Sequence, residues 1–483
     1  MAAFQRLFKH TFIYGLATVL PRMFSFLLVP LYTSPEVMSE ADYGTIIVIY
    51  AYFILFNVIL AYGMETAFFR FYHNSEKKKT IMSTSGWSLL GSSVLILGLA
   101  FLVREHIAAW TEIPVRYISL VIGILLLDAL VIIPFAYLRA REKATRYAVI
   151  KILNVLINLG LNLVFLLWLG NWAGENNFWQ KLYIPDFEIS YVLIANLVAS
   201  GVTLLLMLPF YFKLKFSFDP ALWKNMMRYA IPVLIAGVAF SINEAFDKIL
   251  LDFSGSVTKA EIGAYGACYK LAVFMTLFAT AFRLGIEPFF FSHASSKNAR
   301  ETYATITKYF VVFGSIILVT VMVFLDFLKE LIIRDETYWE AMSVVPLILL
   351  ANLCLGIYHN LSVWYKITDR TKFGAYISVA GAVLTITLNF ALIPVLGYFG
   401  SAIATLAAYF SMMLLSYYYG QKHYPIPYDV KKITGYLTLS IGFSVLSFYV
   451  FPGNYFVGIS LLLLFSGTVF FGEKNELKQL IKK

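Results

Sequence analysis

Fourteen long apolar stretches, separated by short polar segments, constrain this chain more than any other feature of its sequence. Each stretch has about the 20 residues that a helix needs to cross roughly 30 Å of hydrocarbon. The chain is 60% apolar and only 14% charged, whereas soluble domains carry about 25% charged residues. We therefore predict an all-α polytopic membrane protein with transmembrane helices at approximately 11–32, 43–67, 81–103, 116–138, 147–169, 189–212, 229–252, 262–282, 304–326, 341–363, 373–393, 398–419, 432–451 and 454–471.

The basic residues predict the orientation of these helices. Of the 38 Lys and Arg residues, 28 fall in the N-terminus, the C-terminus and alternate loops, six fall in the other loops, and four lie within helices. This asymmetry follows the positive-inside rule and predicts that both termini are cytoplasmic. The net charge of +10 is therefore a topology signal, and we expect no nucleic acid as a partner. The loop cations Lys77, Lys78, Lys79, Arg139, Arg141, Lys143 and Arg146 are expected to contact anionic membrane lipids, or to attract an anionic headgroup.

Two halves of the chain resemble each other, which is common in transporters. Four short matches recur in the same order with offsets from 219 to 227 residues: ADYG with AEIG, GMETAFF with GIEPFFF, FYHNS with FSHAS, and NLVFLLWLG with NFALIPVLG. An even number of helices in each repeat keeps the two halves in parallel orientation. We predict a six-helix lobe at 1–212, a second at 213–420, and two extra helices with a cytoplasmic tail at 421–483.

The stretch LNFALIPVLGYFGSAIATLAAY and the ADYG motif resemble the polysaccharide-transporter branch of the multidrug/oligosaccharidyl-lipid/polysaccharide exporter superfamily. This resemblance implies a flippase for lipid-linked oligosaccharides, such as O-antigen units or capsular and exopolysaccharide units, in the bacterial cytoplasmic membrane. It implies a lipid-linked oligosaccharide as substrate, with a polysaccharide polymerase and glycosyltransferases as expected partners. The resemblance does not select a glycan.

Arg22 is the most unusual intramembrane residue, because it lies near the centre of the first apolar stretch, beside Pro21. Charged groups in the membrane normally face a partner or a wet cavity. We interpret Arg22 as a guanidinium that holds a phosphate in a central cavity. The alternative is a buried ion pair with Asp128 or Glu244, which lie at comparable depth.

The stretch 229–252 carries a second polar cluster. Asn243 with Asp247, and Glu244 with Lys248, are spaced four residues apart, so all four crowd one side of a helix. Together with Lys270 on the next helix, they are predicted to bind sugar hydroxyls and diphosphate, or to carry a coupling proton. The alternative is a self-neutralising Glu244–Lys248 pair that only stabilises packing.

Two further sets of residues stand out. Lys151, Asn154, Asn158 and Asn162 form one polar stripe on the stretch 147–169, in which the amides favour contacts between helices over sugar binding. A separate set, placed near the cytoplasmic ends of the second and eighth helices, is interpreted either as a gate of ion pairs or as ordinary surface pairs: Glu65, Arg70, Arg283 and Glu287.

Signals for an enzyme are absent from the sequence. It has no glycine-rich phosphate loop, no metal-spaced His or Cys set and no nucleophile–base grouping. Cys268 and Cys354 both lie in predicted helices, which indicates neither a disulfide nor a metal site. We therefore expect a transporter without a cofactor. The alternatives are a multidrug exporter or a peptidoglycan lipid-precursor flippase of the same superfamily.

Overall fold

The computed structural model describes residues 26–173, 177–294 and 296–481, together with residues 15, 19–21 and 23. These residues form only helices and the segments that connect them. They divide into two compact units, residues 1–263 with 389–397 and residues 264–388 with 398–483. This division differs from the predicted lobe boundaries at 212 and 420, which stay a prediction.

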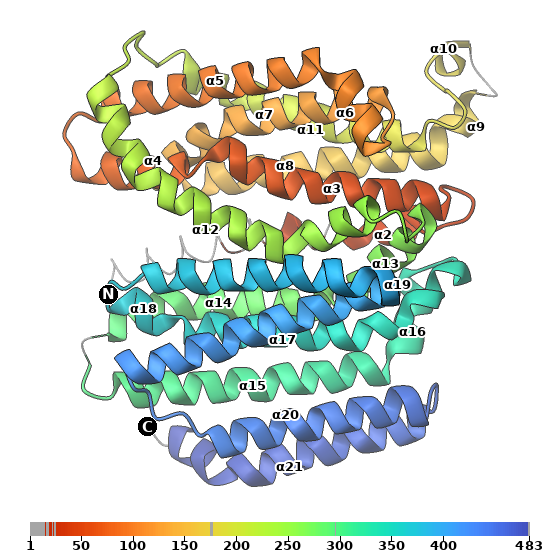
Figure 1. The fold of residues 1–483 in the computed structure, drawn as a ribbon, viewed down its shortest axis with the longest axis vertical. Helices are drawn as coiled ribbons and strands as arrows, with labels where there is room; N and C mark the ends of the chain where they lie inside the picture. The colour runs from red at the N-terminus through yellow and green to blue at the C-terminus, as the bar shows by residue number, and fades with distance from the viewer. Residues whose placement is uncertain are drawn as a thin grey trace. The chain divides into compact units, whose positions relative to one another are not determined.

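The helices of the first unit run along the chain as follows (Figure 1): α2 (Val29–Tyr32), α3 (Glu40–Ala61), α4 (Met64–Asn74), α5 (Lys78–Leu102), α6 (Arg104–Thr111), α7 (Val115–Ala140), α8 (Ala144–Leu163), the π-helical segment η1 (Val164–Trp168), α9 (Leu169–Ala173), α10 (Asn177–Gln180), α11 (Glu188–Tyr211) and α12 (Pro220–Phe253). Two helices, α13 (Lys259–Leu271) and α19 (Lys372–His423), have residues in both units.

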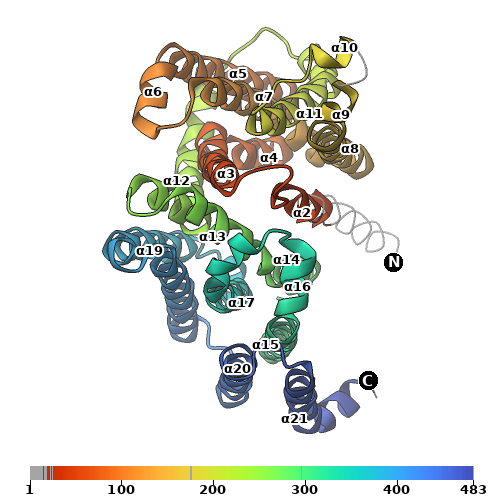
Figure 2. The same ribbon diagram turned by 90° about the vertical axis from the view of Figure 1, so that its right-hand side faces the viewer.

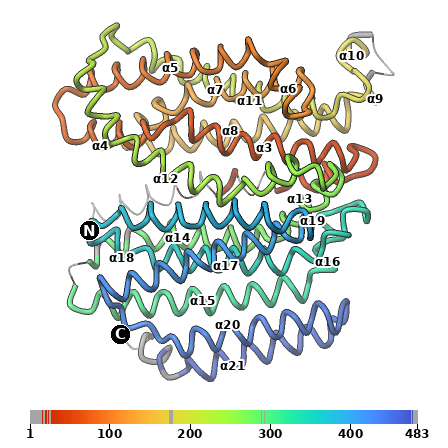
Figure 3. The backbone as a smooth tube through the Cα atoms, viewed as in Figure 1, coloured from red at the N-terminus to blue at the C-terminus, as the bar shows by residue number. Residues whose placement is uncertain are grey.

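The second unit contains α14 (Val273–His293), α15 (Ala299–Val323), α16 (Leu325–Ile332), the 3-10 segment η2 (Glu336–Val344), α17 (Val345–Leu361), α18 (Val363–Ile367), α20 (Val430–Val445), the π-helical segment η3 (Leu446–Val450) and α21 (Tyr455–Ile481). Figure 3 shows α14, α15, α17, α20 and α21 of this unit, which all run across the view in roughly the same direction. The α5–α6 and α15–α16 pairs have the same lengths, 25 and eight residues. An offset of 221 residues relates their starting positions.

Twelve helices of the described residues are long and apolar enough to span a membrane. The predicted number of fourteen is therefore not confirmed. Ten of the 22 residues of the first predicted stretch, 11–32, lie outside the described residues, Arg22 among them. The stretches 373–393 and 398–419 form α19, which is interrupted by non-helical backbone at Gly397 (φ 56°, ψ −139°). Large apolar side chains are exposed on these helices, such as Leu95, Leu205 and Leu463 at 64%, 64% and 66%, which suits contact with lipid.

Helix α7 is central to the first unit. It packs against α3, α4, α5, α8 and α11, and α12 packs against α3 and α4. Figure 2 looks along the helices and shows α3 and α4 beneath α5, α7 and α11. Pro134 lies inside α7 and has no N–H to bond to the carbonyl of Leu130. The Tyr211 hydroxyl of α11 donates to that carbonyl instead, at 2.5 Å. The neighbouring helix therefore supplies the hydrogen bond that Pro134 cannot make.

A break between α3 and α4 positions part of the site described below. Tyr62 and Gly63 both have positive φ, 33° and 72°, and the break is held by a 2.8 Å hydrogen bond between the hydroxyls of Tyr62 and Ser88. A Cβ on Gly63 would lie 2.4 Å from the Ala230 carbonyl oxygen of α12. Both the backbone angle and this close approach require glycine.

In the second unit, α20 and α21 pack against α15 through an apolar cluster that includes Val312, Val319, Tyr436, Phe465 and Val469. A buried ion network lies at one end of this contact. Lys308 of α15 is 4% exposed and donates to Glu473 and Glu476 of α21. Glu473, 1% exposed, also accepts from Lys432 and Tyr436 of α20. The network is not among the predicted site residues.

Candidate functional site

A cavity of about 530 Å³ lies within the first unit. This volume falls in the range of small-molecule sites, about 300–1,000 Å³. Six helices contribute to its wall, and its polar lining residues are Asn57, Glu65, Thr66, Asp128, Tyr147, Lys151, Asn154, Asn196, Ser200 and Thr203. Apolar side chains complete the wall, namely Val58, Ala61, Val131, Ile132, Phe135, Val233 and Leu234.

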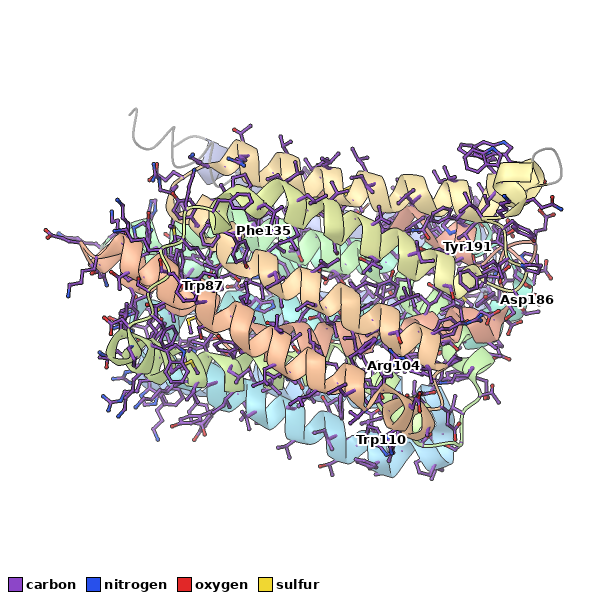
Figure 4. All side chains as sticks on the ribbon, turned by 90° about the horizontal axis from the view of Figure 1, so that it is seen from above. Trp87, Arg104, Trp110, Phe135, Asp186 and Tyr191 are labelled. Carbon is purple, nitrogen blue, oxygen red and sulfur yellow. The ribbon has the colours of Figure 1, made fainter. Side chains whose placement is uncertain are left out.

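The cavity lies toward one end of the helices. Figure 4 shows Phe135, which lines it, toward the same end as Trp87, whereas Tyr191, Asp186 and Arg104 lie toward the opposite end. The lining residues of α3 and α7 come from the C-terminal halves of these helices, those of α11 come from its middle and C-terminal half, and those of α8 come from its first three turns. These are the ends that the Lys and Arg count predicts to be cytoplasmic.

Asp128 of α7 and Lys151 of α8 are the charged groups deepest in the wall, and the structure brings them together in one cavity. The Ser200 hydroxyl of α11 donates to Asp128 Oδ1 at 2.7 Å. The Lys151 ammonium lies 4.4 Å from the centroid of the Phe135 ring and interacts electrostatically with Asp128. A cation–π contact stabilises an ammonium without consuming its hydrogen-bond donors, so Lys151 keeps donors for a ligand.

The polar stripe of α8 divides between the cavity and the packing of the helix. Asn154 lines the cavity and donates through Nδ2 to Thr203 Oγ1 at 3.0 Å. Asn162 is fully buried, donates to the carbonyl oxygen of Asn158 and accepts from the Tyr32 hydroxyl at 2.8 Å. Asn154 and Asn162 therefore both link α8 to a neighbouring helix, and Asn154 also lines the cavity.

The α11 side of the cavity was missing from the predicted residues. Asn196, Ser200 and Thr203 all lie on α11 and line the cavity. Their spacing of four and then three residues places them on one helix face. That spacing is the same signal that identified the stripe on α8, and it is visible in the sequence.

The predicted gate residues Glu65 and Arg70 each contact a residue of a neighbouring helix. Glu65, which lines the cavity, is bonded at 2.7 Å by Arg139 of α7, with both side chains nearly half exposed. Arg70 lies over the Tyr229 ring of α12, 4.4 Å from its centroid. The helix ends around the cavity are therefore linked by Glu65–Arg139 and by Arg70–Tyr229.

Arg283 and Glu287 line a small pocket of the second unit together with His359, Asn360 and Lys366. Glu287 is bonded at 2.6 Å by Lys366 of α18, a residue that was not among the predicted ones. The structure thus gives Glu287 an ion-pair partner in Lys366, and the gate role of Arg283 and Glu287 stays a prediction.

The cluster on α12 lies beyond the cavity of the first unit. Asn243, Glu244, Asp247 and Lys248 follow Gly237, the last α12 residue of the cavity wall. Lys248 bonds both carboxylate oxygens of the adjacent Asp247 at 2.8 Å, and the alternative of a neutralising pair with Glu244 stays a prediction. Lys270 belongs to the second unit. Arg22 lies outside the described residues, so its predicted role stays a prediction.

Several solved structures share the fold of this chain. The structure titled "Lipid II flippase MurJ, inward closed conformation" is 16% identical with a TM-score of 0.74, over 95% of this chain and 99% of MurJ. The structure titled "Crystal structure of MATE in the straight conformation" is 12% identical with a TM-score of 0.60, over 89% of this chain and 96% of that chain. A transporter of the same superfamily from Pyrococcus furiosus is 13% identical with a TM-score of 0.57, over 87% and 95%. At these identities the likeness concerns the fold. No curated protein sequence matches the chain.

Two family models match the sequence. The model described as "Polysaccharide biosynthesis protein" covers residues 7–291, more than half of the chain. The MatE model covers residues 232–391. Both belong to a superfamily of membrane transporters rather than of enzymes, which agrees with the twelve candidate spans and the cavity inside them. The chain belongs to the polysaccharide biosynthesis protein family, within the multidrug/oligosaccharidyl-lipid/polysaccharide exporter superfamily.

Proposed function

We propose that this transporter flips a polyprenyl-diphosphate-linked oligosaccharide from the cytoplasmic to the outer leaflet by alternating access. The cavity of the first unit is the observation that carries the proposal. Its amides and hydroxyls, such as Asn154, Asn196 and Thr203, both donate and accept hydrogen bonds, as sugar hydroxyls require. Lys151 supplies a compact positive charge, which suits a phosphate oxygen. Membership of the polysaccharide biosynthesis family supports the same substrate class.

Orientation and span number belong to the same proposal. We place fourteen helices across a bacterial cytoplasmic membrane, with residues 11–32 as the first and α19 divided at Gly397 into two. The excess of Lys and Arg in alternate loops supports cytoplasmic termini. The cavity then opens from the cytoplasmic half of the first unit, the side on which lipid-linked sugars are assembled.

The remaining predicted residues receive roles in the same mechanism. Arg22, with the α12 cluster and Lys270, is proposed to hold the diphosphate and sugars in a central cavity between six-helix lobes. The ion pairs of Glu65 and Glu287 and the cations Arg70 and Arg283 are proposed as the cytoplasmic gate, whose contacts break when the cavity opens. The two predicted C-terminal helices, with α21 as the last, are proposed to guide the lipid tail.

Depletion of the protein in its own cell tests this proposal. Lipid-linked oligosaccharide is expected to accumulate in the inner leaflet, measured by extraction and by its inaccessibility to a glycan-cleaving enzyme added outside. The expression of Lys151→Ala is expected to leave the accumulation in place, while expression of the wild-type chain removes it. Normal appearance of the glycan outside during depletion would exclude the proposal.

A peptidoglycan lipid-precursor flippase is the second candidate, because the fold matches MurJ over nearly the whole of both chains. The same depletion distinguishes the two functions. Accumulation of a disaccharide-pentapeptide lipid and lysis would support the second candidate. Accumulation of a longer glycan lipid, without a defect in the cell wall, would support the first.

A further inference from the structure

The repeated motif that contains ADYG and AEIG has the same local structure in both places. Ser39 precedes α3, and its hydroxyl donates to Asp42 at 2.6 Å and accepts from the Asp42 N–H at 3.2 Å. Thr258 precedes α13 and accepts from the Glu261 N–H at 3.2 Å, while Glu261 accepts from the Thr258 N–H at 2.7 Å. These are N-terminal caps at positions related by one offset of 219 residues. The acidic residue of each motif therefore takes part in the N-terminal cap of its own helix.

The glycines of the two motifs meet each other. A Cβ on Gly44 would lie 1.8 Å from the Lys259 carbonyl oxygen and 3.0 Å from the Gly263 nitrogen. A Cβ on Gly263 would lie 2.3 Å from the Glu40 carbonyl oxygen and 3.1 Å from the Gly44 nitrogen. Each glycine thus fits against the first turn of the other helix, and neither position has room for a side chain.

The polar side chains near this contact between the two helix ends bond to residues of their own half of the chain, and not across the contact. Ser39 and Asp42 bond each other, as do Thr258 and Glu261. Lys259 forms an ion pair with Asp252, which lies in the preceding helix α12 of the same half. Breaking the contact would therefore separate two backbone surfaces without leaving a capping group unpaired, and so without the cost of about 1–3 kcal/mol that an unsatisfied buried polar group adds.

We propose that Gly44 and Gly263 form a glycine gate on the external side of the protein, closed in this structure and separated when the cavity opens outward. The inference rests on the proposed alternating access. It assigns the repeated motif a role: the caps keep each helix end intact, and the glycines allow the ends to meet. A larger side chain at either position prevents closure, and the protein remains open to the outside.

Distance measurements between spin labels test the gate without any substrate. The labels are attached to Glu36→Cys and Ser256→Cys, which are exposed, in the full chain lacking Cys268 and Cys354 and reconstituted in bilayers. Two distance populations are expected for the otherwise unchanged chain. Gly44→Leu and Gly263→Leu are expected to remove the shorter one. Gly98→Leu is the matched control, because nothing lies within 4 Å of a Cβ there, and it is expected to keep both populations.

Two outcomes would overturn the gate. One is a folded Gly44→Leu protein with the same distances as the parent. The other is a failure of both leucine variants to fold while Gly98→Leu folds, which would make the crossing a fixed structural contact. If the distances shift as expected but oligosaccharide flipping is absent, the gate stands and the proposed substrate is wrong.

Discussion

Lys151 and Asp128 line the same cavity, but the protein compensates their charges in different ways. Asp128 accepts a hydrogen bond from Ser200, whereas Lys151 lies over the Phe135 ring. A carboxylate that already has a donor is partly satisfied, while an ammonium on an aromatic face retains its own donors. Lys151 is therefore the residue of this cavity whose positive charge and N–H donors best suit an anionic ligand.

Lys151→Ala is expected to reduce flipping of the lipid-linked oligosaccharide about ten- to a hundredfold. A hydrogen bond to a charged group contributes about 1.5–3 kcal/mol, and each 1.4 kcal/mol corresponds to a factor of about ten. Lys151→Arg should retain part of the activity, because the charge remains. Lys224→Ala, which changes an exposed lysine on α12, is the control and should be unchanged. Equal rates for Lys151→Ala and wild type would show that the ligand does not use this ammonium.

Glu65 and Arg139 make a different kind of pair, half exposed at the edge of the cavity. An exposed pair contributes at most about 1 kcal/mol to stability, so Glu65→Arg should leave the melting temperature nearly unchanged. It should nevertheless slow transport, because two cations would face each other where α4 meets α7. Glu65→Arg with Arg139→Glu restores the attraction and should recover transport. Failure of the double reversal, with both proteins folded, would argue against the pair as a gate.

At the scale of helices, Pro134 leaves the Leu130 carbonyl of α7 without its backbone hydrogen bond, and Tyr211 of α11 supplies a donor in its place. Tyr211→Phe removes the donor to the Leu130 carbonyl and is expected to cost about 1–3 kcal/mol, the penalty for an unsatisfied buried acceptor. Pro134→Ala gives position 134 an N–H for that carbonyl. Tyr211→Phe should therefore lower the thermal stability in the wild-type background and have a smaller effect in Pro134→Ala. Equal losses in both backgrounds would show that the tyrosine acts elsewhere.

The attachment of α20 and α21 to α15 depends on the buried network around Glu473. Lys308→Ala leaves Glu473 with fewer partners, and breaking a buried pair typically costs about 3–5 kcal/mol. A clear fall in the melting temperature of the detergent-solubilised protein is expected. The combination Lys308→Met with Glu473→Gln should lose less than Lys308→Ala, because no buried carboxylate then lacks its cation, and Glu476, whose side chain is 35% exposed, can be hydrated instead. Lys474→Ala, at an exposed neighbouring position, should be neutral; a loss equal to that of Lys308→Ala would contradict the network's role.

At the scale of the whole molecule, the sequence was sufficient for the fold class and the family. Apolar length identifies spans directly, because each must cross the same thickness of hydrocarbon. Lys308 shows the limit of this approach. It lies near the start of the predicted span 304–326, and hydropathy alone does not show that two carboxylates on α21 enclose it.

The candidate site was predictable only one helix at a time. Glu65, Asp128, Lys151 and Asn154 each stood out by charge or by spacing, yet their meeting in one cavity depends on which helices are neighbours. Periodicity shows which residues share a face of one helix and contains no information about the helix opposite. For the same reason the pairing of Glu65 with Arg139 of α7 cannot be read from the sequence.

The central claim is that this protein itself moves a lipid-linked oligosaccharide across a bilayer. Purified protein in vesicles that contain this lipid gives the most direct test, with a glycan-cleaving enzyme added outside to report the fraction that is exposed. The account predicts that the exposed fraction rises with wild-type protein and rises far less with Lys151→Ala. Vesicles with folded wild-type protein that expose no more glycan than protein-free vesicles would contradict it.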